Sequence, residues 1–167
     1  NTDFEHDSRS VSVLLLLDLS ESLNDIVEAT NQSILELSQE AVSLLAWSVE
    51  QLGDNFAIAG FNSNTREKVM YYHIKGYSEH WDDTVKARLA NLKAEYSTRM
   101  GAAIRHGTHY LNLQKSDKKL MLILTDGEPS DIDVNDSEML IKDTHKAVQE
   151  CQQKGMYPYC ISLDNKA

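Results

Sequence analysis

The chain alternates continuous apolar runs with stretches in which apolar residues recur every three or four positions. The run from Val11 to Leu17 has no helical period, which is typical of a strand buried on both faces of a sheet. Similar runs predict four further strands, at 56–61, 67–74, 120–124 and 157–163.

Helical periodicity occupies most of the sequence between these strands. It predicts a helix from Ile34 to Leu52 that ends at Gly53, and three more over 81–96, 100–111 and 139–154. Residues 62–65 are rich in turn formers and predict a short link, which makes the second and third strands antiparallel. The order of elements predicts a Rossmann-like, doubly wound α/β fold with a mostly parallel sheet, one antiparallel edge strand and helices on both faces.

Polar side chains gather where the buried strands end, which is where doubly wound sheets bind ligands. Asp18, Ser20 and Ser22 follow the first strand, Asp126 follows the fourth, and Thr98 precedes the helix that begins at 100. These are oxygen donors without a thiolate or an imidazole, which favours Mg²⁺, Mn²⁺ or Ca²⁺ over zinc or copper. An anionic oxygen from a partner would complete such a site.

Each of these motifs also has a purely structural interpretation. Residues 22–25 match a capping box, Thr98 follows Ser97 as an ordinary helix cap would, and Asp126 with Gly127 is a common turn pair. Their joint occurrence, each directly after the appropriate element, favours a binding site.

Three motifs together resemble the metal-ion-dependent adhesion site of von Willebrand factor A (VWA) domains: Asp-x-Ser-x-Ser at 18–22, Thr-x-x-Gly-x-Ala at 98–103 and Thr-Asp-Gly at 125–127. The resemblance extends from about Ser10 to Asp164. It implies that the metal, with Mg²⁺ as the first choice, is held by the hydroxyls of Ser20, Ser22 and Thr98 and by the carboxylates of Asp18 and Asp126.

Segments 81–88, 96–106 and 125–133 are similar to the VWA domains of CbbO and NorD proteins. That resemblance implies a partnership with a hexameric MoxR-class AAA+ ATPase. CbbO-type proteins help to reactivate Rubisco, and NorD-type proteins help to mature nitric oxide reductase. The loop 134–138 departs from the expected pattern, so the identity of the client stays open.

The resemblance therefore implies a non-catalytic adaptor that captures an acidic side chain of a client, with Rubisco activation as the first expectation. NorD-like maturation of nitric oxide reductase and an extracellular adhesion module are the alternatives. Four residues near the motifs are expected to contact the partner: Glu21, Arg99, Glu128 and Asp131. Arg99 would either steer an anionic partner or pair with Asp131 or Glu128.

An enzyme is the rival class. The sequence contains no G-x-x-x-x-G-K-[ST] loop, no G-x-G-x-x-G and no G-x-S-x-G, so nucleotide-binding and hydrolase chemistry lack their usual parts. ATP hydrolysis is accordingly expected in a partner, and no catalytic residue is predicted.

Length and composition narrow these expectations. The chain has 167 residues, which predicts one domain. We expect residues 1–9 to be a linker from a preceding region. We expect residues 10–167 to be the VWA domain without its last strand and helix. The longest apolar run is too short to span a bilayer, so no membrane insertion is expected. Cys151 and Cys160 are expected to be buried, reduced thiols, which favours a cytoplasmic location.

Charge is unevenly distributed along the chain. The formal net charge is −10, which makes nucleic acid a poor partner. Residues 1–54 hold 11 acidic residues and one basic residue, and 120–138 hold six acidic residues and no basic one. These two segments supply Asp18 and Asp126, whereas the basic segment 55–119 supplies Thr98 and Arg99. The pattern predicts a negative field that favours a divalent cation, beside a basic segment that favours an acidic partner.

Overall fold

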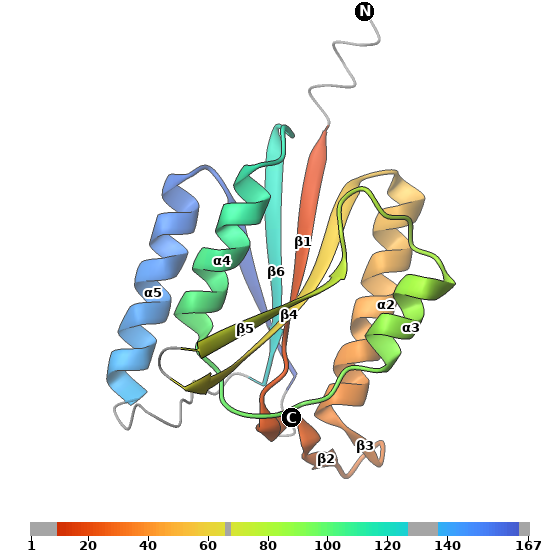
Figure 1. The fold of residues 1–167 in the computed structure, drawn as a ribbon, viewed down its shortest axis with the longest axis vertical. Helices are drawn as coiled ribbons and strands as arrows, with labels where there is room; N and C mark the ends of the chain where they lie inside the picture. The colour runs from red at the N-terminus through yellow and green to blue at the C-terminus, as the bar shows by residue number, and fades with distance from the viewer. Residues whose placement is uncertain (1–9, 66–67, 127–136, 164–167) are drawn as a thin grey trace, which may run out of the picture.

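A computed structural model describes residues 10–65, 68–126 and 137–163 of the chain. Its centre is a five-stranded sheet in the order β5-β4-β1-β6-β7 (Figure 1). The pairs β1–β4, β1–β6 and β6–β7 are parallel, and β5 is antiparallel to β4 at one edge. The strands are β1 (Val11–Asp18), β4 (Asn55–Thr65), β5 (Lys68–Lys75), β6 (Lys118–Thr125) and β7 (Tyr157–Ser162). The predicted fold class is therefore confirmed.

Helices cover both faces of the sheet (Figure 1). One face carries α2 (Ile34–Leu52) and α3 (Asp83–Ala90), and the other carries α4 (Met100–Asn112) and α5 (Ser137–Gln153). A 3₁₀ turn, η1 (Glu21–Asn24), follows β1. It leads into a small hairpin that the sequence did not predict, made of β2 (Ile26–Val27) and β3 (Gln32–Ser33). None of the helices in the described ranges is both long and apolar enough to cross a bilayer.

The apolar run of β1 is explained by its position between two hydrophobic clusters. Leu15 and Leu17 belong to the cluster under α2 and α3, while Leu14 and Leu16 belong to the cluster under α4 and α5. All four side chains are at most 1% exposed. Burying each of them stabilises the fold by about 1.5–3 kcal/mol relative to exposure. A strand with both faces buried has no polar face, which is why its sequence shows no alternation.

Close contact between α4 and the sheet depends on Gly107. A Cβ atom placed there would lie 2.9 Å from Leu14 Cδ2 and 3.1 Å from Met121 Cε. The missing side chain thus lets the helix approach the central strands. Because α4 is held close to the sheet, the residues just before it lie near the end of β1.

Two predicted boundaries were wrong because contacts between distant segments override local propensity. Residues 62–65 form the end of β4 instead of a turn, since Ser63 and Ser97 exchange backbone hydrogen bonds of 2.8 and 3.0 Å. The helix predicted over 81–96 ends at Ala90. Beyond it, 91–99 runs as an irregular segment along the end of β1, with Glu95 N donating to Leu19 O at 2.8 Å.

Three structural interpretations from the sequence were also wrong. Ser22 does not cap the following helix, because α2 begins one hairpin later, where Ser33 and Glu36 form the capping box. Arg99, and not Thr98, is the N-cap residue of α4, and its side chain makes no capping hydrogen bond. Of the two free cysteines, Cys151 is buried but Cys160 is exposed, because it lies on the edge strand β7.

Candidate functional site

The carboxyl ends of β1 and β6 lie side by side, in a register that pairs Leu17 with Leu124. Asp18 comes directly after Leu17 and Asp126 comes two residues after Leu124, so the two are neighbours although 108 positions separate them in the chain. Asp18 is 0% exposed and Asp126 is 6% exposed. Two carboxylates are thus buried together at one edge of the sheet.

Hydrogen bonds from three segments converge on the Asp18 carboxylate. Its Oδ1 accepts from the backbone N–H of Ser20 at 2.9 Å and from Thr98 Oγ1 at 3.0 Å. Its Oδ2 accepts from Thr125 Oγ1 at 2.9 Å. Burial raises the pKa of Asp18, the hydrogen bonds from Ser20 and Thr125 oppose that shift, and the nearby charge of Asp126 reinforces it. The net direction is upward, so the buried charge is only partly compensated by the protein.

A second chain of contacts joins the serines to the other carboxylate. Ser20 Oγ lies 3.2 Å from Ser22 Oγ, and Ser22 Oγ donates to Asp126 Oδ2. Together with the bonds to Asp18 and Thr98, these contacts connect all five predicted metal-site residues in one network. The structure therefore brings together Asp18, Ser20, Ser22, Thr98 and Asp126, which come from three separate loops.

Backbone hydrogen bonds hold these loops in place. Leu19 N donates to Phe61 O at 2.9 Å, and Glu21 N donates to Tyr96 O at 2.8 Å. Tyr96 has a φ of 64°, a left-handed conformation that is uncommon for a residue with a side chain. The segment 91–99 is thus fastened to the end of β1 on one side and, through Ser97, to β4 on the other. This fastening presents Thr98 to Asp18.

The donor set fits a hard divalent cation. Its members are carboxylate and hydroxyl oxygens, the ligands that Mg²⁺, Mn²⁺ and Ca²⁺ prefer. Within the described ranges, no group of three or more His, Cys, Asp or Glu side chains is placed to hold a metal, so a site here depends on its hydroxyls. A cation beside Asp18 would offset the desolvation that raises the pKa of this carboxyl.

The structure locates two of the four residues expected to contact a partner. Glu21 is exposed on η1, and Arg99 is half-buried at the start of α4, directly after Thr98. Both lie beside the buried network. Glu128 and Asp131 lie outside the described residues, as do the rest of the loop 127–136 and the alternative pairing of Arg99 with them.

Sequence reasoning quoted Thr125 as part of a motif but did not assign it to the site. It is 2% exposed, and its hydroxyl binds Asp18 Oδ2. Its position as the last residue of a buried strand, directly before Asp126, was the signal that could have identified it. Thr125 holds the carboxylate from the side opposite Thr98.

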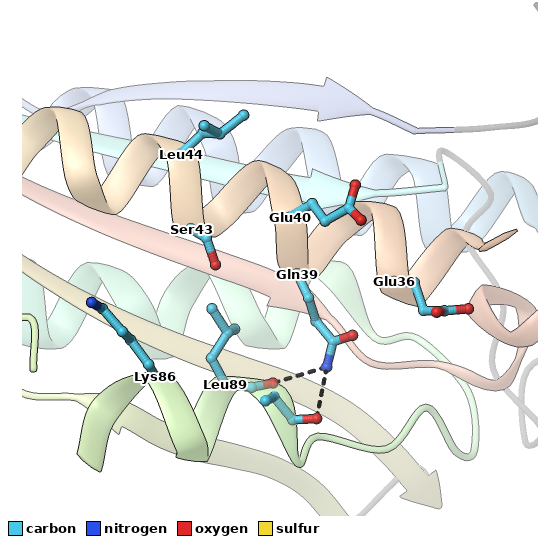
Figure 2. Close-up of a pocket in the computed structure, with 8 residues that line it drawn as sticks. Glu36, Gln39, Glu40, Ser43, Leu44, Lys86 and Leu89 are labelled. Carbon is cyan, nitrogen blue, oxygen red and sulfur yellow. Dashed lines mark hydrogen bonds between the residues drawn. The ribbon is translucent and has the colours of Figure 1, made fainter. Parts of the chain in front are cut away.

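A groove of about 550 Å³ lies between α2 and α3 (Figure 2), and no residue of the buried network lines it. Gln39 ties the two helices together there, because its Nε2 donates to Leu89 O at 2.8 Å and to Ala90 O at 3.4 Å. Glu36 and Glu40 on one wall and Lys86 on the other carry its charges. The side chains that line it offer no convergent set of oxygen ligands comparable to the one at the strand ends.

Comparison with known proteins identifies the class of domain. The sequence profile of the von Willebrand factor type A domain matches residues 12–167, so the chain belongs to this family. The chain is 35% identical over 159 residues to the protein NorD of Stutzerimonas stutzeri, covering 95% of this chain and 26% of that protein. It is 36% identical over 160 residues to NorD of Brucella suis, covering 96% and 25%. It thus spans about a quarter of the length of these relatives.

Solved structures support the fold. The PilB minor pilin from Streptococcus sanguinis matches 93% of this chain and 50% of its own, with a TM-score of 0.72 and 14% identity. The protein BatB from Bacteroides thetaiotaomicron matches 92% of this chain and 66% of its own, with a TM-score of 0.66 and 18% identity. At such low identity the likeness concerns the arrangement of the sheet and helices alone.

Proposed function

We propose that this domain is a divalent-cation-dependent protein-binding module that captures an acidic side chain of a protein client. The observation that carries the proposal is the buried network that joins Asp18 to Asp126 through Ser20 and Ser22 and includes the Thr98 hydroxyl from a second loop. In the proposal, these carboxylates and the hydroxyls of Ser20, Ser22 and Thr98 hold the cation. The bound cation supplies a coordination position for an oxygen from outside the chain.

The coordination of the site leaves a position for an anionic oxygen. Asp18 and Asp126 would neutralise a divalent cation without filling its six or more coordination positions. The hydroxyls are neutral, so one further carboxylate can bind without a large excess of negative charge. Glu21 and Arg99 lie beside the network and would contact the partner, with Arg99 attracting its carboxylate. Glu128 and Asp131 are proposed to border the same contact.

Mg²⁺ is the proposed ion, with Mn²⁺ or Ca²⁺ as alternatives. Mg²⁺ commonly binds through only one or two protein carboxylates and keeps several waters, whereas Ca²⁺ takes six to eight oxygens. Two carboxylates with small hydroxyls between them resemble the first arrangement more closely. The ion that stabilises the protein most strongly at equal concentration will distinguish the three.

The proposal extends to two partners of this domain, the client protein and an ATPase. The similarity to NorD favours the NorD-type role, maturation of nitric oxide reductase, over the CbbO-type activation of Rubisco. In either role the domain is a non-catalytic adaptor that couples the client to a hexameric MoxR-class AAA+ ATPase, which hydrolyses ATP. The free thiols of Cys151 and Cys160 fit such a cytoplasmic role better than an extracellular adhesion module.

The test uses the full-length protein, its ATPase and the candidate client. Asp126→Ala should weaken Mg²⁺ binding by about 100-fold or more in calorimetry, because it removes a charged ligand. Client capture should need Mg²⁺, disappear in EDTA and disappear in Asp126→Ala. The control is Asp25→Ala, an exposed carboxylate close to the same loop.

Two results would overturn parts of this proposal separately. Unchanged Mg²⁺ affinity in Asp126→Ala, with circular dichroism showing an intact fold, would remove the metal site. Client capture that persists in EDTA would leave a metal site without a role in binding. Assays of nitric oxide reductase maturation and of Rubisco reactivation, run with the same variants, decide which client is served.

A further inference from the structure

A cluster of five aromatic and imidazole rings lies on β5 and α4 and shares no residue with the buried network. Tyr71 contacts His73, His106 and Tyr110, with ring centroids 5.1, 4.4 and 5.5 Å apart. Tyr110 in turn contacts His73 at 4.9 Å, His106 at 5.2 Å and His109 at 5.4 Å. We call these five residues the imidazole surface.

The imidazoles of this surface are open to solvent. His73, His106 and His109 are exposed, whereas Tyr71 and Tyr110 are half-buried and lie beneath them. Among the described residues, the side chains of the three histidines contact other rings and form no hydrogen bond. Their ring nitrogens are therefore available to a ligand. The tyrosine rings that they contact are of a residue type that is enriched in protein interfaces.

No carboxylate lies on the elements that form this surface or on the strand beneath it. The sequences of β4, β5 and α4 contain no Asp and no Glu, although the whole chain carries a net charge of −10. Arg105, the neighbouring cation on α4, is engaged by Asp143 and Glu150 of α5 at 3.0 and 3.1 Å. The imidazole surface is thus a region of neutral or positive charge on an acidic molecule.

The neighbouring imidazoles act electrostatically on His106. Partial burial lowers the pKa of His106, and the charges of His73 and His109 lower it further. The other titratable groups in contact with the cluster are Tyr71, whose pKa is raised by burial and by the charges of Tyr77 and Tyr110, and Tyr110 itself. A carboxylate that binds at this surface would oppose this effect, because it stabilises the protonated, imidazolium form.

We propose that the imidazole surface docks an acidic segment of a protein partner, and that acidification strengthens the docking. Charge complementarity on a surface without carboxylates supports an acidic partner, and three clustered imidazoles make the attraction depend on pH. This contact does not require a metal. The imidazole surface is close enough to the candidate metal site for one partner to contact both. Asp18 of β1 pairs with Phe61 of β4, and Phe61 pairs with Tyr71 of β5. Two strand spacings correspond to about 10 Å.

The probe is a short fluorescent oligoglutamate peptide, with oligolysine and oligothymidine as comparisons, all in EDTA. The net charge of −10 opposes nonspecific attraction of oligoglutamate, so any binding has to come from a local surface. Oligoglutamate should bind at least about tenfold more tightly near pH 6 than near pH 8, the range in which imidazoles gain their proton. Oligolysine and oligothymidine should bind more weakly than oligoglutamate near pH 6.

Variants locate the contact. The triple variant His73→Gln, His106→Gln, His109→Gln should lose the pH-dependent binding, and His109→Glu alone should weaken it at least about tenfold, because it places a like charge at the contact. The controls are His80→Gln and His145→Gln, exposed histidines outside the cluster, which should bind as the wild type does.

The same assay separates this inference from the proposed function. Every measurement is made in EDTA, where the metal site of the proposed function takes no part, so binding there reports on the imidazole surface alone. The inference is overturned by pH-independent affinity, by wild-type binding of the triple variant, or by a preference for oligothymidine. None of these results bears on Mg²⁺ binding at the strand ends, which is tested separately.

Discussion

Thr98 donates a hydrogen bond to Asp18 Oδ1 at 3.0 Å, although 80 positions separate the two residues in the chain. Both are almost completely buried. A hydrogen bond to a charged group contributes about 1.5–3 kcal/mol, yet burial still raises the pKa of Asp18. The protein's own groups therefore stabilise this carboxylate incompletely, and this has consequences for stability as well as for binding.

The first prediction concerns the effect of Mg²⁺ on stability. A cation at about 100 times its dissociation constant stabilises a protein by about 2.7 kcal/mol. Asp18→Asn should remove this gain and leave the free energy of unfolding in EDTA unchanged or raised, because the substitution removes a buried charge. Denaturant unfolding with and without Mg²⁺ measures both quantities. Asp25→Asn, an exposed control, should keep the full gain, and a normal gain in Asp18→Asn would contradict the site.

The second prediction separates Ser22, which the sequence offered as a helix cap, from Ser33, which caps α2 in the structure. Ser33 Oγ accepts from Glu36 N at 3.1 Å, so Ser33→Ala should lower the free energy of unfolding by about 1 kcal/mol without affecting Mg²⁺ affinity. Ser22 Oγ binds Asp126, so Ser22→Ala should weaken Mg²⁺ binding with little effect on α2. Calorimetric titration and urea unfolding of both variants test this pair. A loss of Mg²⁺ affinity in Ser33→Ala but not in Ser22→Ala would exchange their roles.

The third prediction concerns the contact between α4 and α5. A Cβ at Gly101 would collide with the side chain of Asp143 and lie 3.2 Å from its backbone oxygen. Gly101→Ala should therefore destabilise the protein by about 1–3 kcal/mol, as overpacking does. Adding Asp143→Ala should recover part of that loss, which a double-mutant cycle measures. Gly76→Ala is the control, because its Cβ would meet only an ordinary contact of 3.7 Å with Glu79.

The fourth prediction concerns alkaline pH. Burial raises the pKa of Tyr71 and Tyr77 well above the ordinary value of 10. The folded state thus keeps both phenols protonated, and their contribution to stability is present below pH 10 and is lost as pH rises above it. Tyrosinate absorbance of these two residues should appear only with unfolding.

Tyr77→Phe isolates one of these groups. Among the described residues, the Tyr77 hydroxyl is buried without a hydrogen-bond partner. Its removal should leave the free energy of unfolding at neutral pH unchanged or raise it by up to about 1 kcal/mol, and should reduce the loss of stability at high pH. Denaturant unfolding at neutral and alkaline pH measures both effects. A strong destabilisation at neutral pH would show that the hydroxyl has a structural partner.

The sequence by itself determined the fold class and the chemistry at the strand ends. Runs such as Val11–Leu17 predict buried strands because a strand with both faces covered has to be apolar throughout. Asp18 and Asp126 were found from their positions after such runs, since the carboxyl ends of parallel strands meet at one edge. Both inferences depend on local patterns in the sequence, which can be recognised without knowing the tertiary structure.

Only the tertiary structure decided how the loops are held and which serine serves which role. The extension of β4 through Ser63 depends on the bonds to Ser97, and the irregular segment after α3 is held by the bond from Glu95 N to Leu19 O. The contact of Ser22 with Asp126 spans 104 positions and outcompetes a local cap, and the bond of Thr125 to Asp18 spans 107. Local propensity contributes tenths of a kcal/mol to about 1 kcal/mol per residue, so a few buried long-range contacts are enough to override it.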